Sequence, residues 1–112
     1  MSEPPVEDLG SAADRRRLQR YRCDVGITIE WGAAHLEGRV FDISSAGMFV
    51  ATEDPLWIGA QFSANLALSR SLHVECVVCR VQPRRGMALS YVVPEQADSS
   101  ALTAYLDSLD TQ

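Results

Sequence analysis

The stretch Tyr21-Arg22-Cys23-Asp24-Val25-Gly26-Ile27-Thr28-Ile29-Glu30-Trp31 alternates between two kinds of side chain along its whole length. One set of alternate positions is apolar or aromatic: Tyr21, Cys23, Val25, Ile27, Ile29 and Trp31. The other set is polar, charged or glycine. Successive side chains of a strand point to opposite faces, so this period of two predicts a long strand with one buried face.

Further strand-like segments follow this one, separated by residues that favour turns. They are expected at 36–43, 48–50, 61–68, 72–81 and 87–93. The fifth strand changes phase, which predicts a β-bulge near Cys76 and Val77, or burial of both faces. Several short strands joined by turns favour an antiparallel barrel or a sandwich.

The pattern becomes helical after Pro94. Asp98 or Ser99 is expected to cap a helix over about 98–109. Its apolar residues recur at helical spacing: Ala101, Leu102, Tyr105, Leu106 and Leu109. This predicts one amphipathic helix packed against the strands.

Length and composition are those of a modest soluble protein. The chain has 112 residues, of which 46% are hydrophobic and 22% charged, enough for one domain and one core. We expect a flexible tail over 1–14 and a single domain over 15–112. No apolar run reaches the length of about eighteen residues that suggests a membrane span. The N-terminus lacks an apolar signal-peptide core. We therefore expect a cytoplasmic protein without membrane contact.

Positive charge is concentrated in one place. The formal net charge is −5, all ten basic residues are arginine, and five of them lie between Arg15 and Arg22. A local cluster on an acidic body fits a small anion better than a nucleic-acid track. The guanidinium fork suits phosphate oxygens and the acceptor edge of guanine. A solvated basic arm is the simpler alternative.

A second notable stretch is Asp42-Ile43-Ser44-Ser45-Ala46-Gly47, between two expected strands. It could be only a turn, because Asp and Ser bond to nearby backbone and Gly supplies a left-handed φ. The same groups also suit guanine, since a carboxylate accepts from its ring N–H and amine, and a hydroxyl donates or accepts. Together, the arginine cluster and this turn offer the groups that a guanine-nucleotide site needs.

Signals for catalysis or metal binding are weak. Neither His35 nor His73 has a sequence partner that would make it a general base. Cys76 and Cys79 have the spacing of half a zinc site, but no second pair of ligands follows. We therefore expect the cysteines to be core residues, and the protein to be neither an enzyme nor a holder of a metal or cofactor.

The pair of motifs resembles a known family. Arg16-x-x-x-Arg20 followed by Asp42-x-Ser44-x-x-Gly47 is similar to the PilZ domain of bacterial cyclic di-GMP receptors, and Gly86-Met87-Ala88-Leu89 is similar to that family's last strand. The resemblance covers about 15–93. It implies a six-stranded antiparallel β-barrel over about 21–93, usually with a C-terminal helix, preceded here by a flexible N-terminal arm.

The resemblance also implies roles for single residues. Arg16 and Arg20 would clamp the phosphates and the O6/N7 edge of guanine. Asp42 and Ser44 would make the other guanine contacts, while Gly47 would keep the turn open.

Two further positions bear on how the ligand binds. In the family, an arginine at the position of Arg15 accompanies an intercalated ligand dimer, which implies two cyclic di-GMP molecules per chain. Arg80 resembles a late ligand-contacting position. Some relatives have an aromatic residue where Cys79 stands, so a stacking contact is expected to be missing here.

The function that follows is a cyclic di-GMP receptor that orders its arm and signals to a downstream protein partner. One alternative is a PilZ-like adaptor with weak or no nucleotide binding. Another is a single-stranded nucleic-acid binder on a related barrel, which would need exposed aromatic residues among basic ones. The aromatic residues here fall mostly at positions expected to face inward, so nucleic acid is not expected as a partner.

Overall fold

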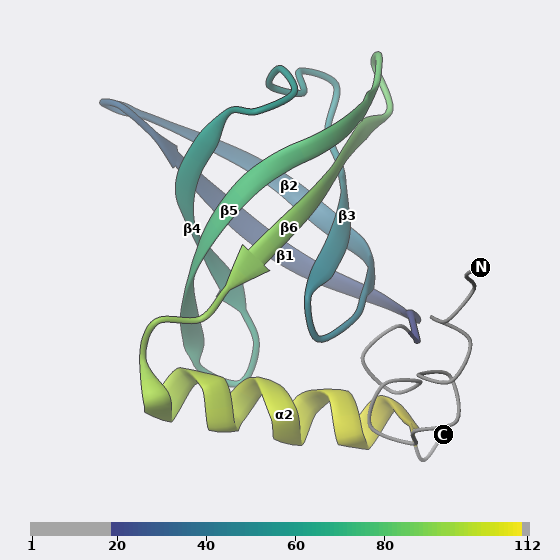
Figure 1. Ribbon diagram of the computed structural model, residues 1–112, viewed down its shortest axis with the longest axis vertical. Helices are drawn as coiled ribbons and strands as arrows, with labels where there is room; N and C mark the ends of the chain where they lie inside the picture. Colours follow the sequence, from purple (N-terminus) through teal and green to yellow (C-terminus); the bar gives the residue numbers. More distant parts are fainter. Residues whose placement is uncertain (1–18, 111–112) are drawn as a thin grey trace, which may run out of the picture.

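The computed structural model describes residues 19–110, and the expected tail and the first three arginines of the cluster lie outside that range. The elements are β1 (Tyr21–Trp31), β2 (Ala34–Ile43), β3 (Gly47–Ala51), β4 (Gln61–Ala67), β5 (Ser71–Gln82), β6 (Gly86–Val92) and α2 (Gln96–Asp110). The strands close into an antiparallel barrel in the order β1-β2-β3-β6-β5-β4 (Figure 1). The prediction of a six-stranded barrel followed by a helix is confirmed, and the sandwich is excluded.

The alternation in β1 holds as predicted. Val25, Ile27 and Ile29 point into the barrel and are buried, while the residues between them are only partly covered. The other strands supply the same kind of inward row. The largest fully buried side chains are Ile29, Ile43, Met48, Leu66, Leu72, Met87, Val40, Val50, Val74, Val78 and Cys76. Each such aliphatic side chain contributes roughly 1.5–3 kcal/mol by leaving water.

The phase change in β5 lies further along the strand than predicted. The register against β6 shifts between Val78 and Arg80, so Cys76 and Val78 face inward and Cys79 is the exposed extra residue. The adjacent apolar residues Val77 and Val78 suit either phase, and tertiary packing selects the one that continues the inward row. The expectation that Cys76 and Cys79 are core residues is therefore confirmed for Cys76 and wrong for Cys79.

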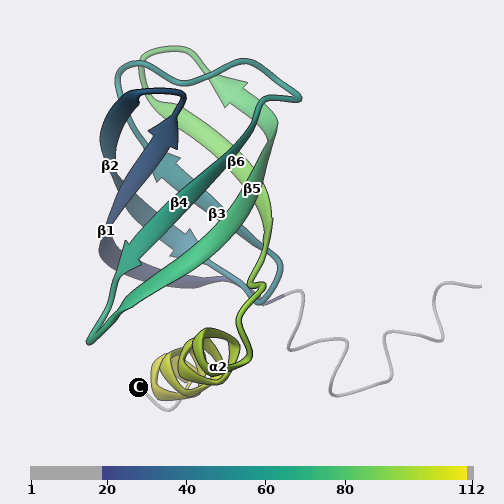
Figure 2. The same cartoon turned by 90° about the vertical axis from the view of Figure 1, so that its left-hand side faces the viewer.

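Helix α2 begins earlier than predicted, at Gln96, and neither Asp98 nor Ser99 precedes it as a cap. Asp98 lies in the first turn and is buried, because its carboxylate pairs with Arg70 at 2.8 Å and accepts the backbone N–H of His73 at 3.2 Å. These contacts attach the start of α2 to the β4–β5 connection. Figures 1 and 2 show α2 lying across one end of the barrel, where Leu102 joins the core.

The opposite end of the barrel carries the β1–β2 hairpin, the connection from β3 to β4 and the β5–β6 turn (Figure 1). Trp57 and Ile58 of the β3–β4 connection are exposed, and the ring of Trp57 meets Trp31 edge-on at a centroid distance of 5.0 Å. Phe41 on β2 is also exposed. The expectation that aromatic residues mostly face inward is met by Phe62 and Tyr91 but not by these side chains, because loop and bulge positions follow no strand alternation.

Within residues 19–110, no helix combines the length and the apolar character needed to cross a lipid bilayer.

Candidate functional site

The turn between β2 and β3 is built around the hydroxyl of Ser44. Ser44 Oγ accepts the backbone N–H of Gly47 at 3.1 Å and that of Ala46 at 3.4 Å. The backbone N–H of Ser44 donates to the Gly47 carbonyl at 2.8 Å. Ser44 is buried as a result. The Ser44 side chain therefore has the structural role expected of a serine in a turn, because it satisfies backbone polar groups of the turn.

Asp42 does not take part in the turn in this way. It follows a register shift between Val40 and Asp42 on β2, and it pairs with Phe49 on β3. Its Oδ1 is buried and accepts no hydrogen bond from the residues that the structure describes. Nε of Arg20 lies 3.4 Å from that oxygen, close enough for an ion pair but not placed for a hydrogen bond. A buried acceptor without a donor calls for an explanation, and a functional role is one of them.

Arg20 lies just before β1 and reaches across to the same turn. Its terminal nitrogens would lie 3.7 and 3.9 Å from a Cβ placed on Gly47. That Cβ would also stand 3.1 Å from the carbonyl oxygen of Leu89. Glycine is thus favoured at this position, because a Cβ would require the Leu89 carbonyl to shift by a few tenths of an ångström. The left-handed φ expected of Gly47 is wrong, since the glycines with positive φ in residues 19–110 are Gly32, Gly59 and Gly86.

Arg80 lies on the outer face of the barrel, in the same row of residues as Asp42. Arg80 on β5 pairs with Ala88 on β6, Ala88 pairs with Phe49 on β3, and Phe49 pairs with Asp42 on β2. Three strand spacings separate the ends of this row, which is about 14 Å. Arg80 therefore shares a face with the Arg20–Asp42 pair without touching it.

Phe49 occupies the middle of that row, and the sequence analysis did not single it out. Its ring covers Gly86, where an added Cβ would come within 2.8 Å of two ring carbons. The signal was present in Met48-Phe49-Val50, because the two residues beside Phe49 are buried and a strand turns the middle one outward. Phe49 gives this face an apolar floor between the carboxylate and Arg80.

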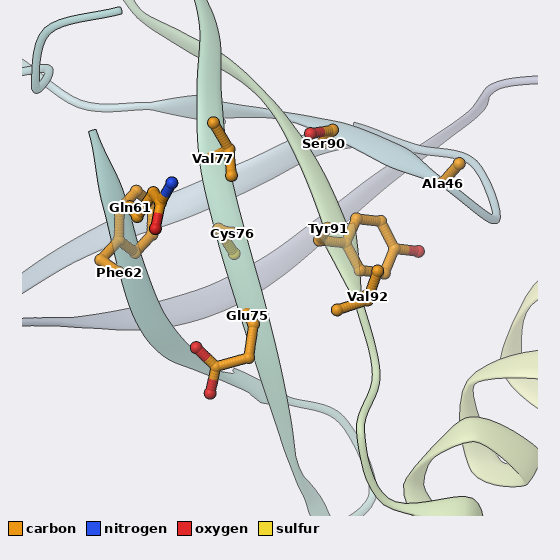
Figure 3. Close-up of a pocket in the computed structure, with 9 residues that line it drawn as sticks. All are labelled: Ala46, Gln61, Phe62, Glu75, Cys76, Val77, Ser90, Tyr91 and Val92. Atoms are coloured by element: carbon orange, nitrogen blue, oxygen red, sulfur yellow. The ribbon is translucent and has the colours of Figure 1, made fainter. Parts of the chain in front are cut away.

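A shallow pocket opens beside the turn, with a volume of about 340 Å³ (Figure 3). This is at the small end of the range of ~300–1,000 Å³ found for ligand pockets. It is lined by the turn residue Ala46 and by parts of β4, β5 and β6: Gln61, Phe62, Glu75, Cys76, Val77, Ser90, Tyr91 and Val92.

Titratable groups beneath the turn feel the charges of the site. Burial, and to a smaller extent the nearby carboxylate of Asp42, raise the pKa of the Cys23 thiol to about 11. Burial also raises the pKa of the Tyr91 phenol, and the cation of Arg20 partly opposes that rise. The thiol and the phenol therefore stay protonated and neutral at physiological pH. No group of three or more His, Cys, Asp or Glu side chains between residues 19 and 110 is arranged to hold a metal ion.

The chain matches the model of a known domain family. The match is to the PilZ domain family and covers residues 14–108. The chain belongs to the PilZ domain family. No curated protein sequence matches this chain.

Solved structures share the PilZ fold. The PilZ domain of YcgR from Escherichia coli, solved with c-di-GMP, is 17% identical with a TM-score of 0.67, over 87% of this chain and 92% of that one. MrkH, described as a c-di-GMP-dependent transcription regulatory factor, is 16% identical with a TM-score of 0.70, over 83% of this chain and 50% of its own.

The inhibitor of motility MotI/DgrA from Bacillus subtilis is 23% identical with a TM-score of 0.67, over 78% of this chain and 47% of that one. The chain thus spans about half the length of MotI and of MrkH. At these identities the likeness concerns the fold.

The PilZ barrel brings together part of the expected site. Arg20, Asp42 and Gly47 meet at one end of the barrel, with the Ser44 hydroxyl turned into the loop beneath them. Arg80 stands apart on the same outer face. Arg15 and Arg16 lie outside the described residues.

Proposed function

We propose that this PilZ domain is a receptor for cyclic di-GMP. The proposed ligand-binding residues are Arg15, Arg16, Arg20, Asp42, Ser44, Gly47 and Arg80. The observation that carries the proposal is the meeting of Arg20 and Asp42 over Gly47, with the buried Oδ1 of Asp42 lacking a hydrogen-bond donor among residues 19–110. Guanine offers a ring N–H and an amine to such an oxygen, and it offers O6 and N7 to an arginine.

Ligand binding exchanges one set of contacts for another. In the ligand-free site, the Arg20 guanidinium covers the carboxylate that guanine would use. Both side chains are more than a third exposed, so their ion pair contributes only ~0–1 kcal/mol and little is lost when it opens. Arg20 then turns to the phosphate or to the O6/N7 edge, and Asp42 accepts from the base. Each new bond is charge-assisted and stronger than a neutral one.

Ser44 contributes to this site through the turn. Its hydroxyl accepts from the N–H groups of Ala46 and Gly47 and donates to the Gly47 carbonyl at 3.3 Å. Its one donor and two lone pairs are thus used within the turn, so a bond to guanine requires one of these bonds to open. Gly47 leaves room for Arg20 above it. Arg80 and the apolar floor at Phe49 extend the surface along the outer face of the barrel.

The proposal includes two ligands per chain. An intercalated pair carries twice the negative charge of one ligand, so stacking needs additional cations nearby. Arg15, next to Arg16, supplies one of them. We further propose that binding orders the N-terminal arm, at an entropic cost, and that a downstream protein partner recognises the ordered arm.

Isothermal titration with cyclic di-GMP, GTP and cyclic GMP tests the receptor function. We expect clear preference for cyclic di-GMP and a molar ratio of two, which Arg15→Leu changes to one while binding persists. Comparable affinity for all three nucleotides would reject the site. A ratio of one for the wild type would reject the ligand pair alone.

Backbone NMR relaxation of residues 14–21, with and without cyclic di-GMP, tests the ordering of the arm. We expect relaxation typical of a rigid backbone in the complex only. Identical relaxation in both states would reject this relay, and absence of any binding would leave the adaptor function as the remaining candidate.

A further inference from the structure

We propose that Tyr91 is a positioning residue whose hydroxyl holds the β2–β3 turn in the shape that binds ligand. The consequence for affinity rests on the proposed function, whereas the consequence for the turn does not. Tyr91 lies on β6, on the inner side of the barrel wall, and was not among the candidate site residues.

Two hydrogen bonds join Tyr91 to the turn. Its phenol donates to the carbonyl oxygen of Ser44 at 2.6 Å, in a buried setting. Its backbone N–H donates to the carbonyl oxygen of Ala46 at 3.1 Å. Figure 3 shows the ring extending from β6 toward the loop that carries Ala46. One residue therefore fixes the carbonyls of two positions in the turn.

The phenol oxygen is not needed to fill the core. Met87 and Leu89, the other inward-facing residues of β6, are apolar and buried. A phenylalanine would fill nearly the same volume as Tyr91, which is only 5% exposed. A buried hydroxyl costs free energy unless it is hydrogen-bonded. The specific contribution of this oxygen is thus its bond to Ser44.

The turn that Tyr91 holds sets the geometry of the site. Ser44 lies two residues after Asp42 and three before Gly47. A change in the direction of its peptide group would move the carboxylate against the guanidinium of Arg20. The charge of Arg20 is felt at the phenol, so the hydroxyl lies within the electrostatic reach of that guanidinium.

Tyr91→Phe removes the bond and keeps the ring. In the protein without ligand, we expect amide hydrogen exchange of Ala46 and Gly47 to become several-fold faster, while amides in β1 and β4 keep their rates. We expect affinity for cyclic di-GMP to fall about two- to tenfold, the range for one neutral hydrogen bond. Tyr105→Phe is the matched control, because it also removes only a phenol oxygen, one that lies on α2 near Cys23; it should leave both readouts unchanged.

Unchanged exchange at Ala46 and Gly47 in Tyr91→Phe would overturn the inference. A uniform rise in exchange across the barrel would also overturn it, since that would indicate general loss of stability. If wild type fails to bind cyclic di-GMP, the proposed function fails, and the exchange comparison still decides the role of Tyr91. If wild type binds and Tyr91→Phe binds equally well, the inference alone fails.

Discussion

Arg20 and Asp42 illustrate how a weak ion pair can matter for binding and contribute little to stability. Their side chains are 43% and 35% exposed, and Nε lies 3.4 Å from Oδ1. A pair in such surroundings is worth only ~0–1 kcal/mol. Its value lies in keeping a cation and an acceptor side by side at the turn.

Replacing Arg20 by alanine should therefore separate binding from folding. We expect affinity for cyclic di-GMP to drop about tenfold to a hundredfold, since a charge-assisted bond is worth roughly 1.5–3 kcal/mol. The free energy of unfolding should change by less than about 1 kcal/mol. Titration calorimetry and urea denaturation measure the two effects.

Arg39→Ala is the control for Arg20→Ala. Arg39 also forms a surface ion pair with a strand carboxylate, that of Asp24 at 2.8 Å, but it stands away from the turn. The Arg39→Ala variant should bind cyclic di-GMP like the wild type. Normal binding by Arg20→Ala would show that this arginine does not clamp the ligand.

At the level of elements, α2 is attached to the barrel by the buried carboxylate of Asp98. Arg70 and the backbone N–H of His73 both bond to it. At the other end of the helix, the phenol of Tyr21 donates to Asp110 at 3.0 Å. The helix therefore spans from the β4–β5 connection to the beginning of β1, next to Arg20.

Asp98→Ala should loosen the start of α2. We expect the free energy of unfolding to fall by about 2–3 kcal/mol, because a hydrogen bond to a charged group is lost and the N–H of His73 loses its acceptor. Urea denaturation measures this loss. Glu95→Ala, at an exposed acid just before the helix, should change stability by no more than about 0.5 kcal/mol. Equal midpoints for wild type and Asp98→Ala would contradict the assigned role of Asp98.

At the level of the whole molecule, the core should make stability sensitive to alkaline pH. Burial raises the pKa of Cys76 to about 12 and that of Cys23 to about 11, from an ordinary value of 9.0. The folded state therefore keeps protons that the unfolded chain releases. The contribution of these buried thiols to the free energy of unfolding should be fully present below about pH 9, and it should be lost as the pH rises toward 12.

Urea midpoints measured between pH 8 and pH 11 test this dependence. Cys76→Ala is the control, since it removes the more strongly shifted thiol and should flatten the decline. The variant will be less stable at every pH, so the comparison concerns the slope. A wild-type midpoint that stays level or rises over this range would contradict the linkage.

Local pattern was sufficient for the elements themselves. The strict alternation of β1 predicted its inward face, and the helical spacing after Pro94 predicted α2, because both signals depend on residues close in sequence. The pattern failed where neighbouring residues were equally apolar. Val77 and Val78 left the phase of β5 undetermined, and the start of α2 depended on Arg70, which comes from a distant connection.

By itself, the sequence determined the kind of fold and the chemical groups of the site: strands from period two, a final helix, an arginine cluster, and a turn with a carboxylate. Tertiary structure alone decided which of those groups meet. Barrel closure pairs strands that are remote in the chain, so it brings Arg20 onto Asp42 and over Gly47, and leaves Arg80 across the face. It also places the Tyr91 hydroxyl under Ser44, 47 residues away, a contact that no local pattern encodes.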